Sequence, residues 1–308
     1  MDLYTDLLMM QEACASCELE NIPARFYDFY RHKGNSKNTL MASNTLKAMK
    51  HMQSCSFSES LIKHTHGILA TSEIQERRFR DTQNLALDHM FQHYLTHPIP
   101  SSWIPTAIDE MGKYISDDNF DNGLIKAATV QYQLEVLSPF NKYSRIVARM
   151  LAINALKWTN LLSYPVLWLS DCFLDVNVEY KDRIVSAYRY DEDMLRIMWI
   201  KFFLLTVNKS ARNSIQLIER LTDIREKHMA ILPKISGGNK SAQAIYEYTA
   251  RNLIVNARQI SDALGLSFSG VTKVVNAFDE AGIIRQVTQK ECYRQFGYTP
   301  VLDLIEYA

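Results

Sequence analysis

The stretch 131-QYQLEVLSPFNKYSRIVARMLAINAL-156 decides the fold. Its second half belongs to the segment 144–158, which is apolar on nearly all sides. Such a pattern is typical of the central helix of a bundle. Its first half ends the segment 124–137, where apolar residues recur at helical spacing. That stripe includes small residues that allow close helix contact: Leu124, Ala127, Ala128, Gln131, Leu134 and Val136. The stretch therefore predicts two helices packed in the interior of a mainly α protein.

The composition is that of an ordinary globular protein of about two domains. Of the 308 residues, 47% are hydrophobic and 22% are charged, and Lys+Arg and Asp+Glu both number 34. This balance gives no overall attraction to nucleic acid or to an anionic membrane. The start MDLYTDLLMM lacks the basic flank of a secretory signal, and an odd number of five cysteines argues against a disulfide framework. We expect a cytoplasmic protein that does not contact membranes.

Long helical patterns continue to about residue 232. Residues 192–232 predict two long helices or one bent helix. Pro233 is expected to end this segment, and the Gly237-Gly238 pair in 233-PKISGGNK-240 is typical of a flexible linker. The predicted organisation is a helical domain over 1–232, a linker over 233–240 and a second domain over 241–308.

The second domain predicts a winged helix-turn-helix. Helical patterns over 243–252, 256–266 and 267–283 are followed by alternating residues over 283–300, which are typical of a β hairpin. Val271, Val274 and Phe278 are expected to face inward on the third helix. The candidate DNA-contacting residues on that helix and on the wing are Ser269, Thr272, Lys273, Asn276, Arg285 and Lys290, with Arg294 also on the wing.

The charge of this domain argues against DNA binding. Residues 241–308 contain six Lys/Arg and seven Asp/Glu, so the net charge is about −1. The alternative role is dimerisation or packing against the first domain. Both interpretations remain open at this stage, because a fold alone does not fix a function.

The run LSPFNKYSRIVARML (137–151) resembles the signature of Fic (Fido) domains, HPFx[D/E]GNGRxxR followed by Leu-Leu. Other segments are similar to this family in the same order: 61–69 with 77–84, then 103–114, 164–170 and 199–207. The resemblance covers roughly residues 10–230 and implies a Fic-type helical bundle. It also implies transfer of AMP from ATP to a hydroxyl group of a target protein.

The resemblance assigns several family roles to positions that here carry another residue. The family's His, which takes the hydroxyl proton, is replaced by Ser138, and its Mg²⁺-binding acid by Lys142. The phosphate-binding Gly-Asn-Gly positions hold Tyr143, Ser144 and Arg145. The first arginine position is Ile146, whereas Pro139, Phe140 and Arg149 match. We therefore expect no catalytic residue and no bound metal.

The run 11-QEACASCELENIPARF-26 resembles the family's inhibitory-helix motif, [S/T]xxxE[G/N], with Ser16, Glu20 and Asn21 in the matching positions. The resemblance places this helix near 10–22 and implies that its glutamate pairs with the second signature arginine. Because an arginine on a buried helix needs a counter-charge, we predict a salt bridge between Glu20 and Arg149 that stabilises the fold.

Three further groups of residues have both a functional and a structural interpretation. Cys14 and Cys17 form a C-x-x-C pair, for which we favour packing over redox or zinc chemistry. His89, His93 and His97 recur every four residues, and we favour a solvated or partner-facing stripe over a metal site. The last group could form a weak anion pocket at a helix N-terminus: Lys142, Ser144, Arg145 and Arg149. The alternative places Lys142 and Arg145 at the surface, with Tyr143 packed over the former cleft.

The sequence thus predicts a bacterial signalling protein with a Fic fold and a degenerate, inactive site. This protein would act by binding a protein partner or DNA. A homodimer is one candidate assembly. The alternative is a divergent nucleotidyl or phosphoryl transferase that uses Lys142 and Arg145 to neutralise phosphate. No cofactor is expected under the first interpretation, and ATP with Mg²⁺ under the second.

Overall fold

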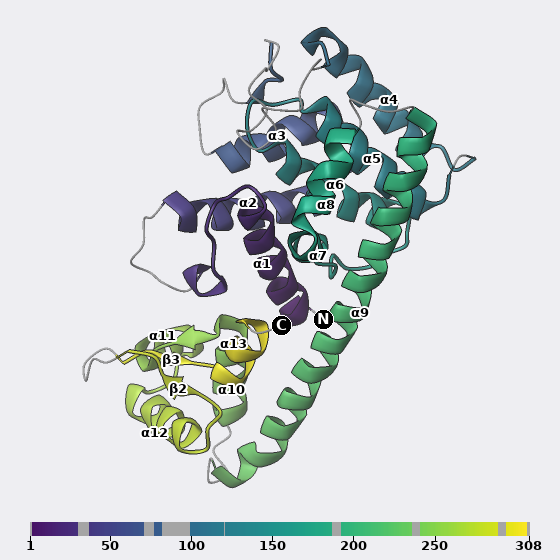
Figure 1. Cartoon of the computed structure of the whole chain (residues 1–308). Helices are drawn as coiled ribbons and strands as arrows, with labels where there is room; N and C mark the ends of the chain where they lie inside the picture. The colour runs from purple at the N-terminus through teal and green to yellow at the C-terminus, as the bar shows by residue number, and fades with distance from the viewer. Residues whose placement is uncertain are drawn as a thin grey trace. The chain divides into compact units, whose positions relative to one another are not determined.

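A computed structural model describes residues 2–29, 37–70, 77–81, 99–119, 121–186, 192–235, 241–288 and 294–306. The protein is mainly α, as predicted (Figure 1). It divides into two compact units, one of residues 5–214 and the other of residues 1–4 with 215–308. No described helix combines the length and the apolar character needed to cross a bilayer.

The helices of the first unit begin with α1 (Asp2–Glu18), α2 (Lys37–Gln53), α3 (Glu59–Ala70), α4 (Ile104–Ser116), α5 (Gly123–Leu137) and α6 (Ser144–Trp158). They continue with α7 (Leu169–Asp175), α8 (Asn177–Ser186) and the first part of α9 (Glu192–Ile235). Short 3₁₀ turns occupy Phe26–Phe29 and Ser101–Trp103. Helices α5 and α6 match the two helices that the opening stretch predicted.

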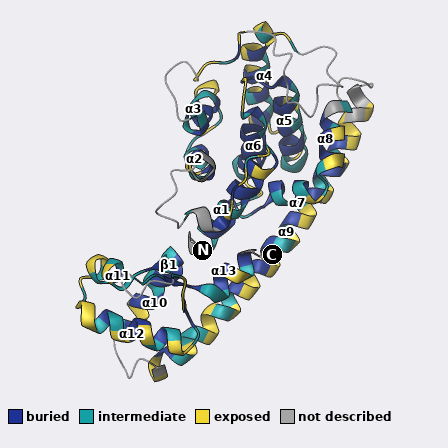
Figure 2. Ribbon diagram, turned by 60° about the vertical axis from the view of Figure 1, so that its left-hand side comes forward, coloured by how far each residue is buried: buried dark blue, intermediate teal, exposed yellow. Residues whose placement is uncertain are grey.

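Helix α6 lies at the centre of this unit, as its all-round apolar pattern predicted (Figure 2). Every residue of α6 from Ser144 to Leu156 is buried except Arg145. Helix α5 packs along α6, and α2 and α3 also contact it. The Asn122 side chain caps α5 by accepting hydrogen bonds from two backbone N–H groups of its first turn. This packing fixes the segment 138–143 between two buried helices.

Helix α9 corrects two sequence predictions. Residues 192–235 form one helix, and Pro233 lies within its last turn instead of ending it. Proline has no N–H to bond to the carbonyl four residues earlier, but only two helical residues follow it, so the disruption is confined to the helix end. The boundary between the compact units also falls within α9, between residues 214 and 215, and not at the expected linker. Residues 236–240 of that linker lie outside the described residues.

The second unit contains the predicted order of three helices and a β hairpin. Its elements are α10 (Ser241–Asn252), β1 (Ile254–Val255), α11 (Ala257–Leu264), α12 (Phe268–Glu280), β2 (Arg285–Gln286), β3 (Phe296–Gly297) and α13 (Thr299–Glu306). The strands form an antiparallel sheet in the order β1-β3-β2. Strand β1 and helix α13 were not predicted from the sequence.

Local sequence explains the boundaries of α11 and α12. Asn256 caps α11 in a reciprocal arrangement with Gln259, and Gly265 ends this helix with a left-handed φ of 64°. Ser267 then caps α12. The residues predicted to face inward on α12, Val271, Val274 and Phe278, are buried together with Val275.

Candidate functional site

The segment between α5 and α6 has an unusual backbone at both ends. Ser138 has φ 42° and ψ 65°, and Tyr143 has φ 62° and ψ 9°. Both values lie in the left-handed region, which costs a residue other than glycine roughly 1–2 kcal/mol. By the resemblance to the Fic signature, Tyr143 occupies a glycine position. The left-handed conformation is thus present here without glycine, the residue that adopts this conformation most readily.

Arg80 holds the start of this segment. Its Nε donates a hydrogen bond to the carbonyl oxygen of Ser138 at 2.8 Å, and its Nη2 donates to those of Leu137 at 3.1 Å and Ile99 at 2.7 Å. The backbone N–H of Arg80 donates to Pro139 O at 2.9 Å. The buried guanidinium thus lies against carbonyl groups at the C-terminus of α5 that have no partner within the helix, and a cation is favourable there.

Contacts within the segment and with α3 hold its second half. The Ser144 hydroxyl accepts a hydrogen bond from Phe140 N–H at 2.9 Å and donates one to Phe140 O at 3.0 Å. The His66 ring stacks on the Phe140 ring at a centroid distance of 3.8 Å, and its Nε2 lies 3.0 Å from Lys142 O. Because a carbonyl oxygen only accepts, His66 Nε2 carries the proton. The Ser144 hydroxyl thus donates its hydrogen to Phe140 O within the turn, which disfavours the anion-pocket interpretation for this residue.

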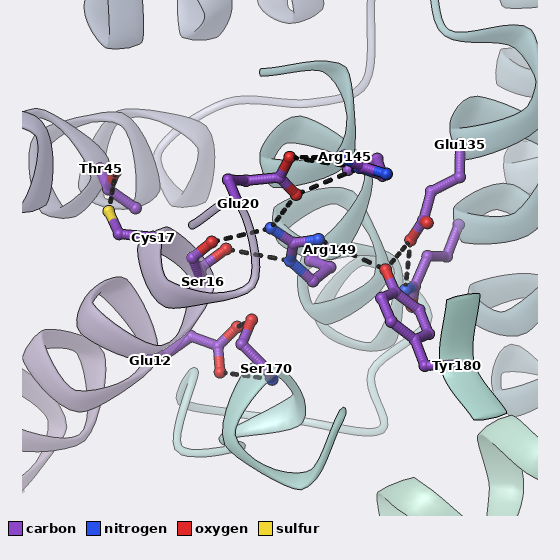
Figure 3. Close-up of polar contacts among 11 residues, drawn as sticks. Glu12, Ser16, Cys17, Glu20, Thr45, Glu135, Arg145, Arg149, Ser170 and Tyr180 are labelled. Carbon is purple, nitrogen blue, oxygen red and sulfur yellow. Dashed lines mark hydrogen bonds and ion pairs between the residues drawn. The ribbon is translucent and has the colours of Figure 1, made fainter. Parts of the chain in front are cut away.

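Glu20 ion-pairs with both arginines of α6 (Figure 3). One carboxylate oxygen lies 3.0 Å from Arg149 Nη2 and the other lies 2.8 Å from Arg145 Nη2. Arg145 Nε also donates to both oxygens at 3.2 Å. The predicted pair of Glu20 and Arg149 is confirmed, and Arg145 is a second partner that the prediction missed.

Ser16 completes the N-terminal motif. Its hydroxyl accepts from Arg149 Nε at 3.0 Å and its carbonyl accepts from Arg149 Nη2 at 2.9 Å. Asn21 takes φ 57° directly after Glu20, and its backbone N–H donates to Glu18 O at 2.8 Å. The motif thus brings a hydroxyl, a carbonyl and a carboxylate to one fully buried guanidinium.

Electrostatics keep these groups charged. Burial alone would raise the pKa of Glu20, but the guanidinium groups of Arg145 and Arg149 outweigh it and lower that pKa. Burial would likewise lower the pKa of Arg149, whereas the neighbouring Tyr180, Glu20 and Glu135 raise it. An anion entering this site would have to displace Glu20 from two cations.

A second buried acid lies on the other side of Arg149. Arg149 Nη1 donates to the Tyr180 hydroxyl at 3.3 Å, and that hydroxyl donates to Glu135 Oε1 at 2.5 Å. Gln131 Nε2 donates to the same oxygen at 2.8 Å. Burial raises the pKa of Glu135 against the opposing effect of Arg149. This part of the network was not predicted from the sequence.

Glu12 joins α1 to α7. Its carboxylate accepts from the backbone N–H of Ser170 at 2.9 Å and from the Ser170 hydroxyl at 2.5 Å. Burial raises the pKa of Glu12 to about 7 despite these hydrogen bonds. The N-terminal segment is therefore held at two points: Glu12 of α1 contacts α7, and Glu20, just after α1, contacts α6.

A cavity of about 1030 Å³ borders the segment between α5 and α6. Its polar lining residues include Asn21, His66, Arg78, Asp81, Lys142 and Tyr143. Lys142 is exposed, whereas the side chain of Arg145 is only 16% exposed and contacts Glu20. The four candidate anion-binding residues are thus separated: Lys142 borders the cavity, Ser144 bonds the turn, and Arg145 and Arg149 hold Glu20.

The residues in the signature positions do not fit a magnesium ion. The position of the metal-binding acid holds Lys142, which is a cation, and oxygen ligands are what Mg²⁺ requires. Within the described ranges, no group of three or more His, Cys, Asp or Glu side chains could hold a metal. His89, His93 and His97 lie outside the described residues.

The C-x-x-C pair is buried in the core. Cys14 and Cys17 are free thiols, and Cys17 Sγ lies 3.4 Å from Thr45 Oγ1. Burial raises the pKa of Cys17 to about 11. A protonated, inaccessible thiol is a poor nucleophile and a poor metal ligand, so the packing interpretation is favoured.

In the second unit, α12 presents the expected polar residues. Ser269, Lys273 and Asn276 are exposed, and Arg285 is exposed on β2. Thr272 is half-buried, and its hydroxyl donates to the carbonyl oxygen of Phe268, so it is less accessible than expected. Lys290 lies outside the described residues.

Comparisons with known proteins point to one fold. No protein-family model matches the chain, and no curated protein sequence matches it significantly. A solved Fic family protein from Desulfovibrio desulfuricans G20 is similar in structure, with a TM-score of 0.60 at 16% identity, over 95% of this chain and 86% of its own. A Fic domain containing signaling protein from Bacteroides thetaiotaomicron VPI-5482 has a TM-score of 0.55 at 14% identity, over 70% of this chain and 87% of its own. The chain therefore has the Fic fold.

Proposed function

We propose that this protein is a Fic-fold regulatory protein that does not transfer AMP and acts by binding, with DNA as the partner of its second unit. The observation that carries the proposal is the pairing of Glu20 with both Arg145 and Arg149, beside a signature whose base position holds a serine. The first feature occupies the cations that would bind phosphate. The second removes the group that would accept the proton.

The residue in the base position cannot do the work of histidine. A serine hydroxyl is not basic enough to accept a proton near neutral pH, and general-base catalysis contributes about 10²–10⁴ in rate. Ser138 is also buried, and its carbonyl oxygen bonds to Arg80. The segment is thus held in place but lacks a proton acceptor at this position.

Binding of ATP together with Mg²⁺ is opposed at three points. Glu20 competes for Arg145 and Arg149. The Tyr143 side chain replaces a glycine where phosphate oxygens would approach the backbone. Lys142 replaces the carboxylate that would hold the metal. These three features affect different requirements of AMP transfer: free cations, room for the phosphate oxygens and a metal ligand. Reversing one of them therefore does not restore transfer.

The test combines binding with chemistry. Calorimetry with ATP and Mg²⁺ should give no binding heat, and incubation with α-labelled ATP and a cell lysate should label no protein. An active Fic adenylyltransferase assayed in parallel shows that both measurements work. Labelling of a target protein by the wild-type chain contradicts the proposal.

The cavity favours a second candidate function. Its volume of about 1030 Å³ and its lining by Arg78, Lys142 and His66 suit an anionic ligand next to the signature. A divergent nucleotidyl or phosphoryl transferase would use Lys142 to neutralise phosphate there. Binding of ATP that weakens on substitution Lys142→Ala, together with label transfer, is the result that favours this alternative.

The proposed DNA contact draws on the second unit alone. The order α10, β1, α11, α12, β2, β3 supports a winged helix-turn-helix, a motif in which the recognition helix enters the major groove. Ser269, Lys273 and Asn276 face outward on that helix. Because the unit has almost no net charge, the expected affinity is modest and falls with added salt. Fluorescence anisotropy with a labelled duplex at several salt concentrations tests this.

A further inference from the structure

The first residue of α12 is an exposed aromatic. Phe268 is 53% exposed and follows directly after the capping residue Ser267. The other residues that α12 exposes towards solvent in its first two turns are polar, Ser269 and Lys273. Phe268 is therefore the apolar side chain that these two turns expose to solvent.

Arg258 lies against this ring. Its guanidinium carbon is 5.8 Å from the Phe268 ring centroid, within the range of a cation–π contact. Arg258 belongs to α11, so the contact joins the two helices of the helix-turn-helix at the N-terminus of α12. It places a cation beside the exposed ring.

A second arginine, Arg294, lies just before β3 and contacts α12 further along its length. Arg294 Nη2 is 3.5 Å from Asn276 Oδ1, two turns beyond Phe268. Three cations thus lie along α12: Arg258 of α11 near its first turn, Lys273 in its middle and Arg294 near Asn276. The acidic Asp279 and Glu280 lie at the C-terminal end of α12. This local distribution suits a phosphate backbone although the net charge of the unit does not.

We propose that Phe268 contacts the C5-methyl groups of thymine in the major groove and makes the protein selective for sites that contain A·T pairs. The N-terminal residues of a recognition helix are those that reach base edges. The thymine methyl is the apolar group exposed on the floor of the major groove, and phenylalanine is one of the side chains that contact it. Arg258 then lies beside the ring, where it can neutralise an adjacent phosphate. This inference rests on the proposed DNA binding.

The test starts from a duplex selected by the full-length protein out of a randomised library. Replacing thymine by uracil in that duplex removes the methyl groups and leaves every hydrogen-bonding group unchanged. Wild type should bind the uracil duplex about fourfold more weakly for each methyl group that the ring would have covered, the factor expected from burying one such group. Phe268→Ala should bind both duplexes equally, and Phe268→Leu, which keeps an apolar side chain, should retain the preference for thymine.

Controls separate this inference from the function on which it rests. Leu161→Ala removes an exposed apolar side chain of the first unit and should bind like wild type. If wild type binds DNA but does not distinguish thymine from uracil, or if Phe268→Ala still does, the thymine contact is wrong and DNA binding stands. If the selection enriches no duplex and no salt-dependent binding is found, DNA binding itself fails, and the inference with it.

Discussion

Glu20 and Arg149 are 129 residues apart in the sequence, and their side chains meet at 3.0 Å in the interior of the helical unit. The Arg149 side chain is fully buried and that of Glu20 is 12% exposed. Arg145, one turn before Arg149 on α6, contacts the other carboxylate oxygen. One carboxylate therefore pairs with two cations on α6.

Removing this carboxylate should destabilise the helical unit. Glu20→Gln leaves a buried guanidinium without its counter-charge, and breaking such a pair costs about 3–5 kcal/mol. Chemical denaturation followed by circular dichroism measures the decrease in stability. Glu18→Gln, on an exposed carboxylate two residues earlier, should change the free energy of unfolding by less than about 0.5 kcal/mol. Equal effects of the two substitutions would show that the ion pairs contribute no stability.

Arg80 should be required for the conformation of the segment 138–143. Arg80→Met keeps much of the apolar stem but leaves three carbonyl groups without their donor, so we expect a decrease in stability of about 2–3 kcal/mol. Hydrogen exchange should show faster exchange in this segment. Arg78→Met, at an exposed position two residues earlier, serves as the control and should leave exchange unchanged. Unaltered protection in Arg80→Met would refute this role.

The raised pKa of Glu12 predicts a dependence of stability on pH. The folded value of about 7 lies above the ordinary value of 4.5, so the folded state binds the proton more tightly than the unfolded state. This contribution is fully present below pH 4.5 and is lost as the pH rises through 7, by about 3 kcal/mol in total. Glu12→Gln, which cannot ionise, should remove it.

The measurement is the free energy of unfolding of wild type and Glu12→Gln at about pH 5, 6, 7 and 8, a range that spans the titration of this group. The wild type should lose stability relative to the variant as the pH rises. The contribution of Glu20 to stability depends on pH in the opposite direction, because its pKa is lowered in the folded state. This contribution is lost only as the pH falls below the ordinary value of 4.5, so Glu20 does not affect the measured range. A constant difference between the two proteins across that range would contradict the assignment.

Cys17 should be inert in the native protein. It is fully buried, and burial raises its pKa to about 11, so little thiolate forms at neutral pH and reagents cannot reach it. Alkylation with iodoacetamide, followed by mass spectrometry, should modify the partly exposed Cys55 before Cys17. Modification of Cys17 as fast as Cys55 without denaturant would favour the redox interpretation of the C-x-x-C pair.

The parts of this protein that the sequence predicts are those encoded locally. Periodicity predicted α5 and α6, and the capping residues Asn256 and Gly265 mark the bounds of α11. The N-terminal motif predicted the partner of Arg149, because a charge on an apolar helix needs a counter-charge. The same reasoning applies to Arg145, which lies four residues earlier on the same face of α6.

The rest depends on long-range contacts that no local pattern reveals. Arg80 reaches a carbonyl group 58 residues away in the chain, and Glu12 bonds Ser170 over 158 residues. Tyr180 and Glu135 gain their roles only when α8 packs against α5. A buried charged residue outside a recognised motif is indistinguishable in sequence from a solvated one.

The most direct measurement is nucleotide transfer by Glu20→Gly, with Glu20→Gln as a second variant and circular dichroism to verify that each is folded. Releasing Arg145 and Arg149 frees the cations but restores neither a base at Ser138 nor a metal-binding acid at Lys142. The expected result is no label transfer from ATP in the presence of Mg²⁺ to any protein, including the variant itself. Transfer of AMP by either folded variant would show that the remaining residues suffice for the chemistry, and would contradict the account of an inactive Fic fold.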